Sequence, residues 1–416
     1  MNQSNNRIVI LGAGFTGLFT ALHLSHQRCS LPTVLIDQEG RFIFKPLLYE
    51  FLSNEMKADQ VWPSYEDLMY DSGVTFVQDT VQAIDLQTRQ VTLTSGLHYT
   101  YSNLVLALGS ITGYFGTQGA QEHSFSFRTG EDAIALGRHL RDCLQRASQT
   151  EDPQARRSLL TVVIIGAGPT GVELAATLAD LLPDWYVPLG GNPQEIRVVL
   201  LNRGKEILSG DVNSRLRETA QASLQKRTVP VELLLGAAVS AVNPNQVEFK
   251  RHDQVEALAA ATIVWTAGTA THPLIKNLPI PEEHRDKHGR LQVTPTLQLP
   301  DFPEVFAAGD CTVSGQEPAL PPTAQVAYQQ GAAIAYNLKA IAEGHSPKPG
   351  KVNLRGTLMK LGLGEGVANI FDRFEVKGKV GNLIRQAAYL ELLPTPIHNF
   401  KATTEWLTDE VFHRYQ

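Results

Sequence analysis

The pattern Gly-x-Gly-x-x-Gly occurs twice in the 416-residue sequence, at residues 12–17 and 166–171. Each copy directly follows an apolar run typical of a buried β-strand and precedes a helix-like run. In this setting the glycines allow a tight turn and a close approach of the backbone to a pyrophosphate, which the following helix N-terminus attracts. One such pattern alone is weak evidence. The repeat predicts two dinucleotides on one protein, a tightly held flavin and an exchangeable nicotinamide.

Length and composition predict a folded protein of two or three domains. The sequence is 43% apolar and 19% charged, and its length exceeds that of one ordinary core. A net charge of -6 without a dense basic stripe argues against a nucleic-acid partner. The N-terminus lacks the pattern of a signal peptide, and no apolar run is long enough for a spanning helix. We therefore expect synthesis and residence on the cytosolic side.

The cysteines argue against disulfide chemistry. Cys29, Cys143 and Cys311 lie far apart in the sequence. Disulfide reductases built on two dinucleotide folds need a closely spaced redox pair. We therefore interpret each cysteine as a small apolar packing residue. The 12 histidines are scattered, so no metal site is expected.

The first half of the sequence contains the expected companions of the first glycine pattern. Asp37 ends a strand-like run about 20 positions after Gly17, the usual place of an acid that binds the ribose hydroxyls of an adenosine. The alternating stretch 74–95 predicts a small antiparallel sheet. Residues 104–109 predict a buried strand ending in a glycine turn, and the polar stretch 148–158 is interpreted as a linker.

Residues 161–268 repeat the layout of the first unit, with an insertion at 181–195. The fold class predicted is α/β, with two Rossmann-like dinucleotide-binding domains as in glutathione reductase and a C-terminal region. A further strand at 305–308 returns to the first sheet, and Asp310 after it is either a ligand-binding acid or a turn residue. We expect an FAD-binding domain at 1–115 and 290–345, an NAD(P)H-binding domain at 116–289, and a third region at 346–416.

The third region has a basic balance, with 10 Lys and Arg against 7 Asp and Glu. Its apolar positions are compatible with an amphipathic helix lying on a membrane. A helix packed on the flavin domain or in a homodimer is an equally open interpretation. The apolar positions are Leu383, Ile384, Ala387, Ala388, Leu390 and Leu393, interrupted by Arg385 and Glu391.

From residue 7 to about 410 the sequence resembles the type II NAD(P)H:quinone oxidoreductases, single-subunit NADH dehydrogenases that pump no protons. Besides the two glycine patterns, residues 104–109, 266–268 and 305–311 carry this resemblance. Its most specific part is the Ala-Gln-x-Ala-x-Gln-Gln segment at 324–330, which disulfide and ferredoxin reductases lack. The branch resembled occurs in cyanobacteria and plastids, where the acceptor is plastoquinone or a demethylphylloquinone-type naphthoquinone.

The resemblance assigns catalytic roles to four residues. It implies that Gln325 and Gln329 are polar groups on the flavin and quinone sides of the site, where an amide binds without adding charge. Lys45 would lie near the isoalloxazine and stabilise the reduced, anionic flavin; the alternative is a surface lysine. Glu173 would lie beside the nicotinamide; the alternative is a first-turn acid favoured by the helix dipole.

The patterns and the resemblance together place two sets of residues at the cofactors. The FAD set is Gly12, Gly14, Phe15, Thr16, Gly17, Asp37, Gln38, Lys45, Pro46, Val81, Ala107, Gly109, Gly309, Asp310, Ala324 and Gln325. The NAD(P)H set is Gly166, Gly168, Pro169, Thr170, Gly171, Glu173, Asn202, Arg203, Ala267 and Gly268.

The function implied is electron transfer from NAD(P)H through FAD to a membrane quinone. Its expected partners are the quinone, the lipid bilayer surface and a second copy in a homodimer, with peripheral attachment to the membrane. Two other functions stay open. One is a flavoprotein reductase that passes electrons to a small iron–sulfur protein. The other is a non-catalytic NAD(P)H-binding redox sensor.

The sequence differs from the family at the position expected to bind the adenosine ribose of the nicotinamide nucleotide. Members that prefer NADH end the second strand of the nucleotide domain with an acid, and here Asn202 and Arg203 stand at that place. A carboxylate repels a 2′-phosphate, whereas an arginine pairs with it. The departure favours NADPH or dual use.

We predict that NADPH is preferred, by a factor on the order of ten. Asn202→Glu should shift the preference strongly toward NADH, because the new carboxylate accepts from the ribose hydroxyls and repels the 2′-phosphate. The measurement is kcat/KM for both nucleotides in both proteins. A wild-type protein that prefers NADH by a wide margin would contradict the prediction.

Overall fold

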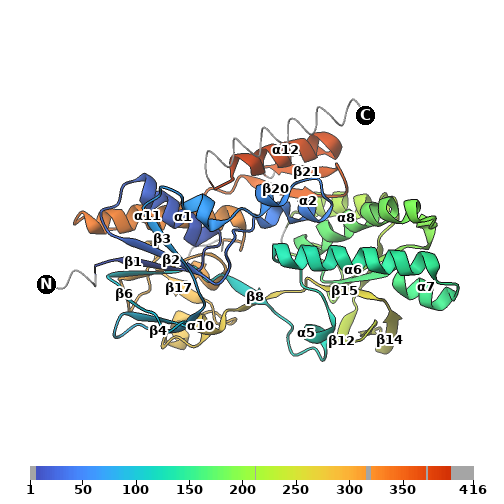
Figure 1. Ribbon diagram of the computed structural model, residues 1–416, viewed down its shortest axis with the longest axis horizontal. Coiled ribbons are helices and arrows are strands. Elements are labelled where there is room, and N and C mark those ends of the chain that lie inside the picture. Colours follow the sequence, from blue (N-terminus) through green and yellow to red (C-terminus); the bar gives the residue numbers. More distant parts are fainter. Residues whose placement is uncertain (1–5, 211, 315–319, 372, 395–416) are drawn as a thin grey trace.

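Residues 6–394, apart from 211, 315–319 and 372, are described by the computed structural model (Figure 1). The first sheet is parallel, with the strand order β18-β7-β1-β2-β3. Its central strand β1 (Ile8–Leu11) is apolar and fully buried, as expected for a strand covered on both faces. The edge strand β18 (Val305–Ala307) pairs with β7 (Asn103–Leu106), so a late segment of the chain completes a sheet begun at the N-terminus.

The alternating stretch at 74–95 belongs to two sheets. β3 (Val74–Gln78) pairs in parallel with β2 (Thr33–Asp37) at the other edge of the first sheet. Only β4 (Val81–Asp85) and β5 (Gln90–Leu93) join β6 (His98–Thr100) in the small antiparallel sheet. The prediction of one antiparallel sheet was therefore wrong for β3, because alternation does not show which strand a segment pairs with.

The second sheet repeats the parallel arrangement, in the order β11-β10-β9-β15. Helix α8 (Pro169–Tyr186) follows its glycine turn as α1 (Phe15–His26) follows the first. The strands are β9 (Thr161–Ile165), β10 (Arg197–Asn202), β11 (Glu232–Leu235) and β15 (Thr262–Trp265). An antiparallel sheet of β12 (Ala238–Asn243), β13 (Gln246–Arg251) and β14 (Gln254–Ala259) lies beside it.

The interpretation of residues 148–158 as a linker was wrong. Helix α6 (Gly130–Gln149) runs into this stretch, and α7 (Pro153–Leu159) fills most of the rest. The polar residues there act as helix caps: Asp152 accepts from the backbone N–H of Gln154, and Pro153 occupies the first helical position. The connection between the two sheets is instead the antiparallel pair of β8 (Ser110–Thr112) and β16 (Thr269–Thr271), and β8 crosses between the two halves in Figure 1.

The third unit consists of an antiparallel sheet and a helix. Strands β20 (Gly356–Lys360), β21 (Gly366–Ile370) and β22 (Phe374–Lys377) pair in sequence, and α12 (Gly378–Glu391) packs on them. In Figure 1 this unit lies over α2 (Leu48–Leu52) and α8, at the boundary between the two halves. In the part of the chain that the structure describes, no helix has the length and apolar character needed to cross a membrane.

Helix α11 (Ala324–Ala342) connects the third unit to the first sheet by packing closely on α1. A Cβ at Gly331 would lie 2.5 Å from the Thr16 carbonyl oxygen, so only glycine permits this approach. The remaining elements are η2 (Lys45–Leu47), α3 (Ala58–Val61), α4 (Tyr65–Met69), α5 (Ala120–His123), η3 (Val187–Leu189), η4 (Pro193–Glu195), α9 (Ser214–Gln225), α10 (Pro273–Lys276), η5 (Glu282–His284), β17 (Leu291–Val293), η6 (Gly309–Cys311) and β19 (Thr312–Ser314).

Candidate functional site

The first glycine turn forms a bare backbone cradle. Gly12 has a φ of 91°, and a Cβ there would lie 2.4 Å from the Ala107 carbonyl oxygen. A Cβ at Gly17 would lie 1.8 Å from the Gly12 carbonyl oxygen. A Cβ at Gly14 would meet no atom within 4 Å, and no side chain caps the N-terminus of α1 there. The open side of the turn therefore presents free helical N–H groups, the arrangement that binds a pyrophosphate.

The second glycine turn has the same construction. Gly166 has a φ of 107°, and its Cβ would lie 2.7 Å from the backbone of Ala267. A Cβ at Gly171 would lie 1.8 Å from the Gly166 carbonyl oxygen, whereas Gly168 again faces open space at an uncapped helix N-terminus. Pro169 and Thr170 begin α8, just as Phe15 and Thr16 begin α1. The duplication inferred from sequence thus extends to the geometry of the turns.

The residue at the end of the second strand differs between the two halves. Asp37 accepts from the backbone N–H of Ala13 at 2.6 Å, and burial raises the pKa of its carboxyl. Asn202 accepts from the equivalent N–H of Ala167 at 3.3 Å, and its amide donates to the carbonyls of Gly204 and Glu206. The asparagine carboxamide therefore stabilises the loop after β10 through its own bonds. Arg203, the next residue, is exposed.

Lys45 begins η2, and its side chain is exposed although protein atoms crowd around it. These atoms displace water from the ammonium group and lower its pKa to about 8, and the charge of Arg128 is the next largest cause. Asp310, after β18, accepts from the Ser110 hydroxyl at 2.9 Å. A recess lined by Asp310, Thr323 and Gln330, among others, opens at the N-terminus of α11. The cradle, the ribose acid and this recess fit FAD.

Other predicted FAD residues border these features. Ala107 and Gly109 follow β7, and Gly309 donates its N–H to the Gln330 side chain at 2.9 Å. Gln38 follows Asp37, Pro46 lies in η2, and Ala324 begins α11. Val81 begins β4, in the small antiparallel sheet. At the second cradle, Ala267 and Gly268 follow β15.

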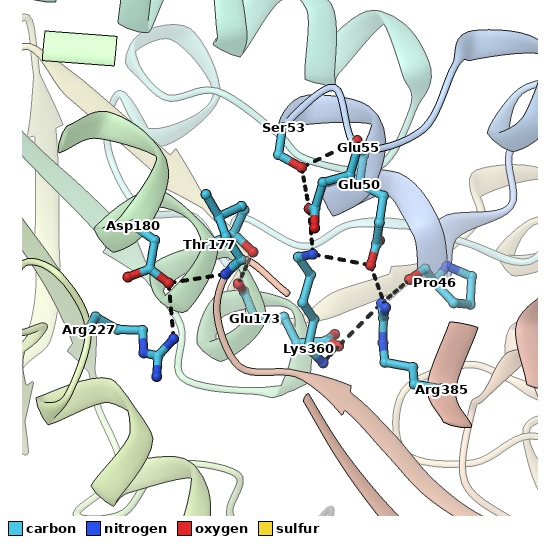
Figure 2. Close-up of polar contacts among 11 residues, drawn as sticks. Pro46, Glu50, Ser53, Glu55, Glu173, Thr177, Asp180, Arg227, Lys360 and Arg385 are labelled. Atoms are coloured by element: carbon cyan, nitrogen blue, oxygen red, sulfur yellow. Dashed lines mark hydrogen bonds and ion pairs between the residues drawn. The ribbon is translucent and has the colours of Figure 1, made fainter. Parts of the chain in front are cut away.

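Glu173 lies at the junction of the three units. It lies in α8 just beyond the first turn, which contains no acidic residue, so the alternative of a first-turn acid is wrong. Its Oε1 accepts from the backbone N–H of Lys360 at 2.7 Å (Figure 2). The Arg385 guanidinium lies 4.0 Å from the same oxygen. Burial raises the pKa of Glu173 to about 7, although Arg385 acts in the opposite direction. This carboxyl can therefore hold or release a proton near neutral pH.

A buried ionic cluster surrounds Glu173. The side chains of Glu50, Lys360 and Arg385 are fully buried, and Lys360 Nζ lies 3.3 Å from Glu50 Oε1 and 2.6 Å from Glu55 Oε2 (Figure 2). Arg385 donates to Glu50 and to the Pro46 carbonyl. Burial raises the pKa of Glu50, but the charges of Arg385 and Lys360 outweigh this and hold it below its usual value. The cluster thus fixes β20 and α12 to α2.

The cluster was missed by sequence reasoning. Arg385 was interpreted as an interruption of an apolar helix face, and Lys360 was not considered. Leu390 and Leu393, assigned to that face, are buried, whereas Leu383 is exposed. An arginine flanked by apolar residues within a helix was the available signal. A second network attaches the third unit to the second half: Arg227 bonds Asp180 at 3.0 Å and Glu365 at 2.6 Å.

Gln325 and Gln329 lie on α11, and their amides bind the segment that leads into β20. Gln325 donates to the Gly356 carbonyl at 3.0 Å and accepts from the Arg355 N–H at 3.0 Å. Gln329 donates to the Asn353 carbonyl at 3.1 Å and accepts from the Asn353 N–H at 2.9 Å. Gln329 also donates to the Gln325 carbonyl at 2.7 Å, so both of its N–H groups are engaged.

Comparisons with known proteins agree with this geometry. Residues 6–331 match the family model of pyridine nucleotide-disulphide oxidoreductases. The chain is 34% identical to the demethylphylloquinone reductase of Synechocystis, over 98% of this chain and 97% of that protein. It is 31% identical to an alternative NAD(P)H-ubiquinone oxidoreductase of Arabidopsis thaliana, over 96% and 80% of the two chains.

The chain belongs to the type II NAD(P)H:quinone oxidoreductases. It is therefore an enzyme, a flavoprotein oxidoreductase that uses FAD and NAD(P)H. The fold agrees: the structure of NDH2 from Plasmodium falciparum in complex with NADH superposes with a TM-score of 0.85 at 17% identity, covering 98% of each chain. The family model is named for disulphide chemistry, but Cys29, Cys143 and Cys311 are all free here.

The buried cluster generates a stability prediction. Arg385→Met should lower the free energy of opening of α12 by about 3–5 kcal/mol, because Glu50 loses its main counter-charge in the interior. Hydrogen exchange of the α12 amides measures this. Lys379→Met, on the same helix but exposed, is the matched control. Equal protection in Arg385→Met and wild type would show that the pair does not hold the helix.

Proposed function

We propose that the enzyme transfers two electrons from NAD(P)H, with NADPH favoured or both nucleotides used, through FAD to a membrane naphthoquinone or plastoquinone. The support is the pair of equivalent cradles joined by β8 and β16, with the third unit closing over their boundary. The name of the Synechocystis relative favours a demethylphylloquinone-type acceptor. When bound, FAD would supply the hydride-accepting and electron-transfer chemistry, and the residues of the chain supply position and charge.

The proposed FAD site lies along the first cradle, Asp37, Lys45 and Asp310, and the nicotinamide nucleotide binds along the second cradle. Arg203 is exposed beside Asn202, so it is free to meet a 2′-phosphate. Glu173, whose pKa is raised to about 7 by burial, can hold or release a proton near neutral pH in the junction between the two cradles. We propose that this carboxyl supplies a proton when the acceptor is reduced, and that Lys45 stabilises negative charge on the flavin side.

The proposed quinone site lies where α11 meets the third unit. Both N–H groups of Gln329 are engaged by backbone carbonyls. Gln325 donates one N–H to Gly356, and its second N–H has no partner among the described residues. Gln325 is therefore the glutamine with a donor left for a quinone carbonyl, and Gln329 fixes the segment beside it.

The two glutamines test the function as a matched pair. Gln325→Leu should slow reoxidation of the flavin by a naphthoquinone about threefold to tenfold more than Gln329→Leu does, which corresponds to one hydrogen bond. Both variants should retain nearly wild-type flavin reduction by NADPH. Stopped-flow spectroscopy separates the two half-reactions. If a variant slows flavin reduction as much as flavin reoxidation, α11 merely supports the flavin. If Gln325→Leu and Gln329→Leu slow reoxidation equally, the assignment of the quinone contact to Gln325 is wrong.

Peripheral attachment to the cytosolic side of a membrane is the second part of the proposal. Phe371, Phe374, Val380 and Leu383 are exposed on the third unit, which is also the basic part of the chain. Apolar side chains beside basic residues are typical of a surface that enters the headgroup region of a bilayer. Residues 395–416, part of the predicted membrane region, lie outside the described residues. The alternative is that a second copy of the chain binds this face and forms a homodimer.

We predict that a Phe371→Ser/Phe374→Ser double variant binds anionic vesicles at least tenfold more weakly than wild type. Each phenylalanine buries apolar area worth roughly 1.5–3 kcal/mol. Co-sedimentation with vesicles measures the binding. Tyr70→Ser, a change at a more exposed aromatic residue outside the third unit, is the control. Unchanged sedimentation of the double variant, together with a shift in oligomeric state, would assign the face to a second copy.

A further inference from the structure

Arg128 is a half-buried cation that forms no ion pair with any residue the structure describes. It stands just before α6, and its Nη2 donates to the Ser110 carbonyl at 2.6 Å and to the Ser110 hydroxyl at 3.3 Å. Among the described residues, no carboxylate forms an ion pair with its guanidinium. The nearby Asp132 carboxylate accepts instead from the backbone N–H groups of Arg128 and Thr129, as part of the α6 cap. Most of the guanidinium donors are therefore free to meet another group.

Arg128 is linked to the proposed flavin recess through Ser110 and Asp310. The carbonyl and hydroxyl of Ser110 accept from Arg128, and the same hydroxyl donates to the Asp310 carboxylate at 2.9 Å. Lys45 is the second cation there, and it too forms no ion pair within the described part of the chain. Burial lowers the pKa of both Lys45 and Arg128, and each is influenced by Asp310 and Asp132. Within the described residues neither Asp310, which accepts from Ser110, nor Asp132, which accepts from the α6 cap, forms an ion pair with either cation, so both cations keep donors for a negatively charged group.

We infer that Arg128 is a positioning residue of the FAD site, which orients Asp310 through Ser110 and, with Lys45, favours the reduced cofactor. Uptake of two electrons and one proton leaves one additional negative charge on the flavin, and a nearby cation stabilises that charge more than the neutral oxidised ring. The planar fork of an arginine suits the two contacts with Ser110, which a lysine cannot reproduce. The inference rests on the FAD placement proposed above and is independent of the electron acceptor.

The experiment separates the charge of Arg128 from its contacts. FAD affinity and midpoint potential are measured in Arg128→Met, Arg128→Lys and Ser110→Ala, by apoprotein titration with oxidised FAD and by reductive titration with dithionite. The control is Arg89→Met, which removes an equal charge from a side chain that is 53% exposed and paired with Glu304 at 2.9 Å. No quinone or nucleotide is added, so failure of the proposed acceptor function would not affect these measurements.

Arg128→Met should weaken binding of reduced relative to oxidised FAD about tenfold, which lowers the midpoint potential by about 30 mV. Arg128→Lys should keep the potential but bind oxidised FAD several-fold more weakly, and Ser110→Ala should behave in the same way. Arg89→Met should leave both quantities unchanged. A wild-type potential in Arg128→Met, or an equal fall in Arg89→Met, would overturn the inference. If Arg128→Met retains no FAD, its potential cannot be measured, and the affinity of Arg128→Lys for oxidised FAD becomes the test. An affinity equal to that of the wild-type protein would then overturn the inference.

Discussion

The buried ionic cluster of Glu50, Lys360 and Arg385 determines how the rest of the molecule is assembled. Its members come from α2 in the first half and from β20 and α12 in the third unit, and Glu173 adds α8 from the second half. A charge buried without its partner costs several kcal/mol, so the cluster is stable only when all of these elements are in place. The relative position of the two dinucleotide cradles is therefore coupled to the docking of a segment that lies 187 positions after Glu173 and 310 positions after Glu50.

The third unit also takes part in holding the two halves together, apart from the membrane contact proposed for it. Gln329 fixes Asn353 to α11, Gln330 reaches the Gly309 N–H, and Arg227 holds Asp180 and Glu365 in the second half. These contacts connect the segment before β20 to both cradles. The quinone site proposed at this place would therefore draw on all three units, and no one unit would form it alone.

The repeated parts of the fold could be predicted from the sequence, and the non-repeated parts could not. Residues 12–17 and 166–171 predict their turns because the steric need for glycine is local: a Cβ at Gly17 or Gly171 would collide with the preceding turn. The pairing of β3, by contrast, depends on a partner strand that alternation does not identify. The cluster at Arg385 was missed because its partners lie more than 300 positions away in the sequence. The stretch 148–158 was misjudged because its polar residues cap helices instead of separating them.

The two carboxyls at the junction have opposite effects on its pH dependence. The folded protein lowers the pKa of Glu50. The ionised carboxylate therefore stabilises the fold at pH values above its pKa in the unfolded chain, and this stabilisation is lost as the pH falls through its pKa in the folded protein. The folded protein raises the pKa of Glu173 to about 7. Its contribution to stability is therefore complete at pH values below its pKa in the unfolded chain, and it is lost as the pH rises through its pKa in the folded protein. Both contributions are complete only near pH 4.5, the ordinary glutamate pKa that the two carboxyls share, and the Glu173 contribution declines from there up to about pH 7. Glu173 can exchange a proton near pH 7 while the Glu50 pairs that hold the three units together stay ionised.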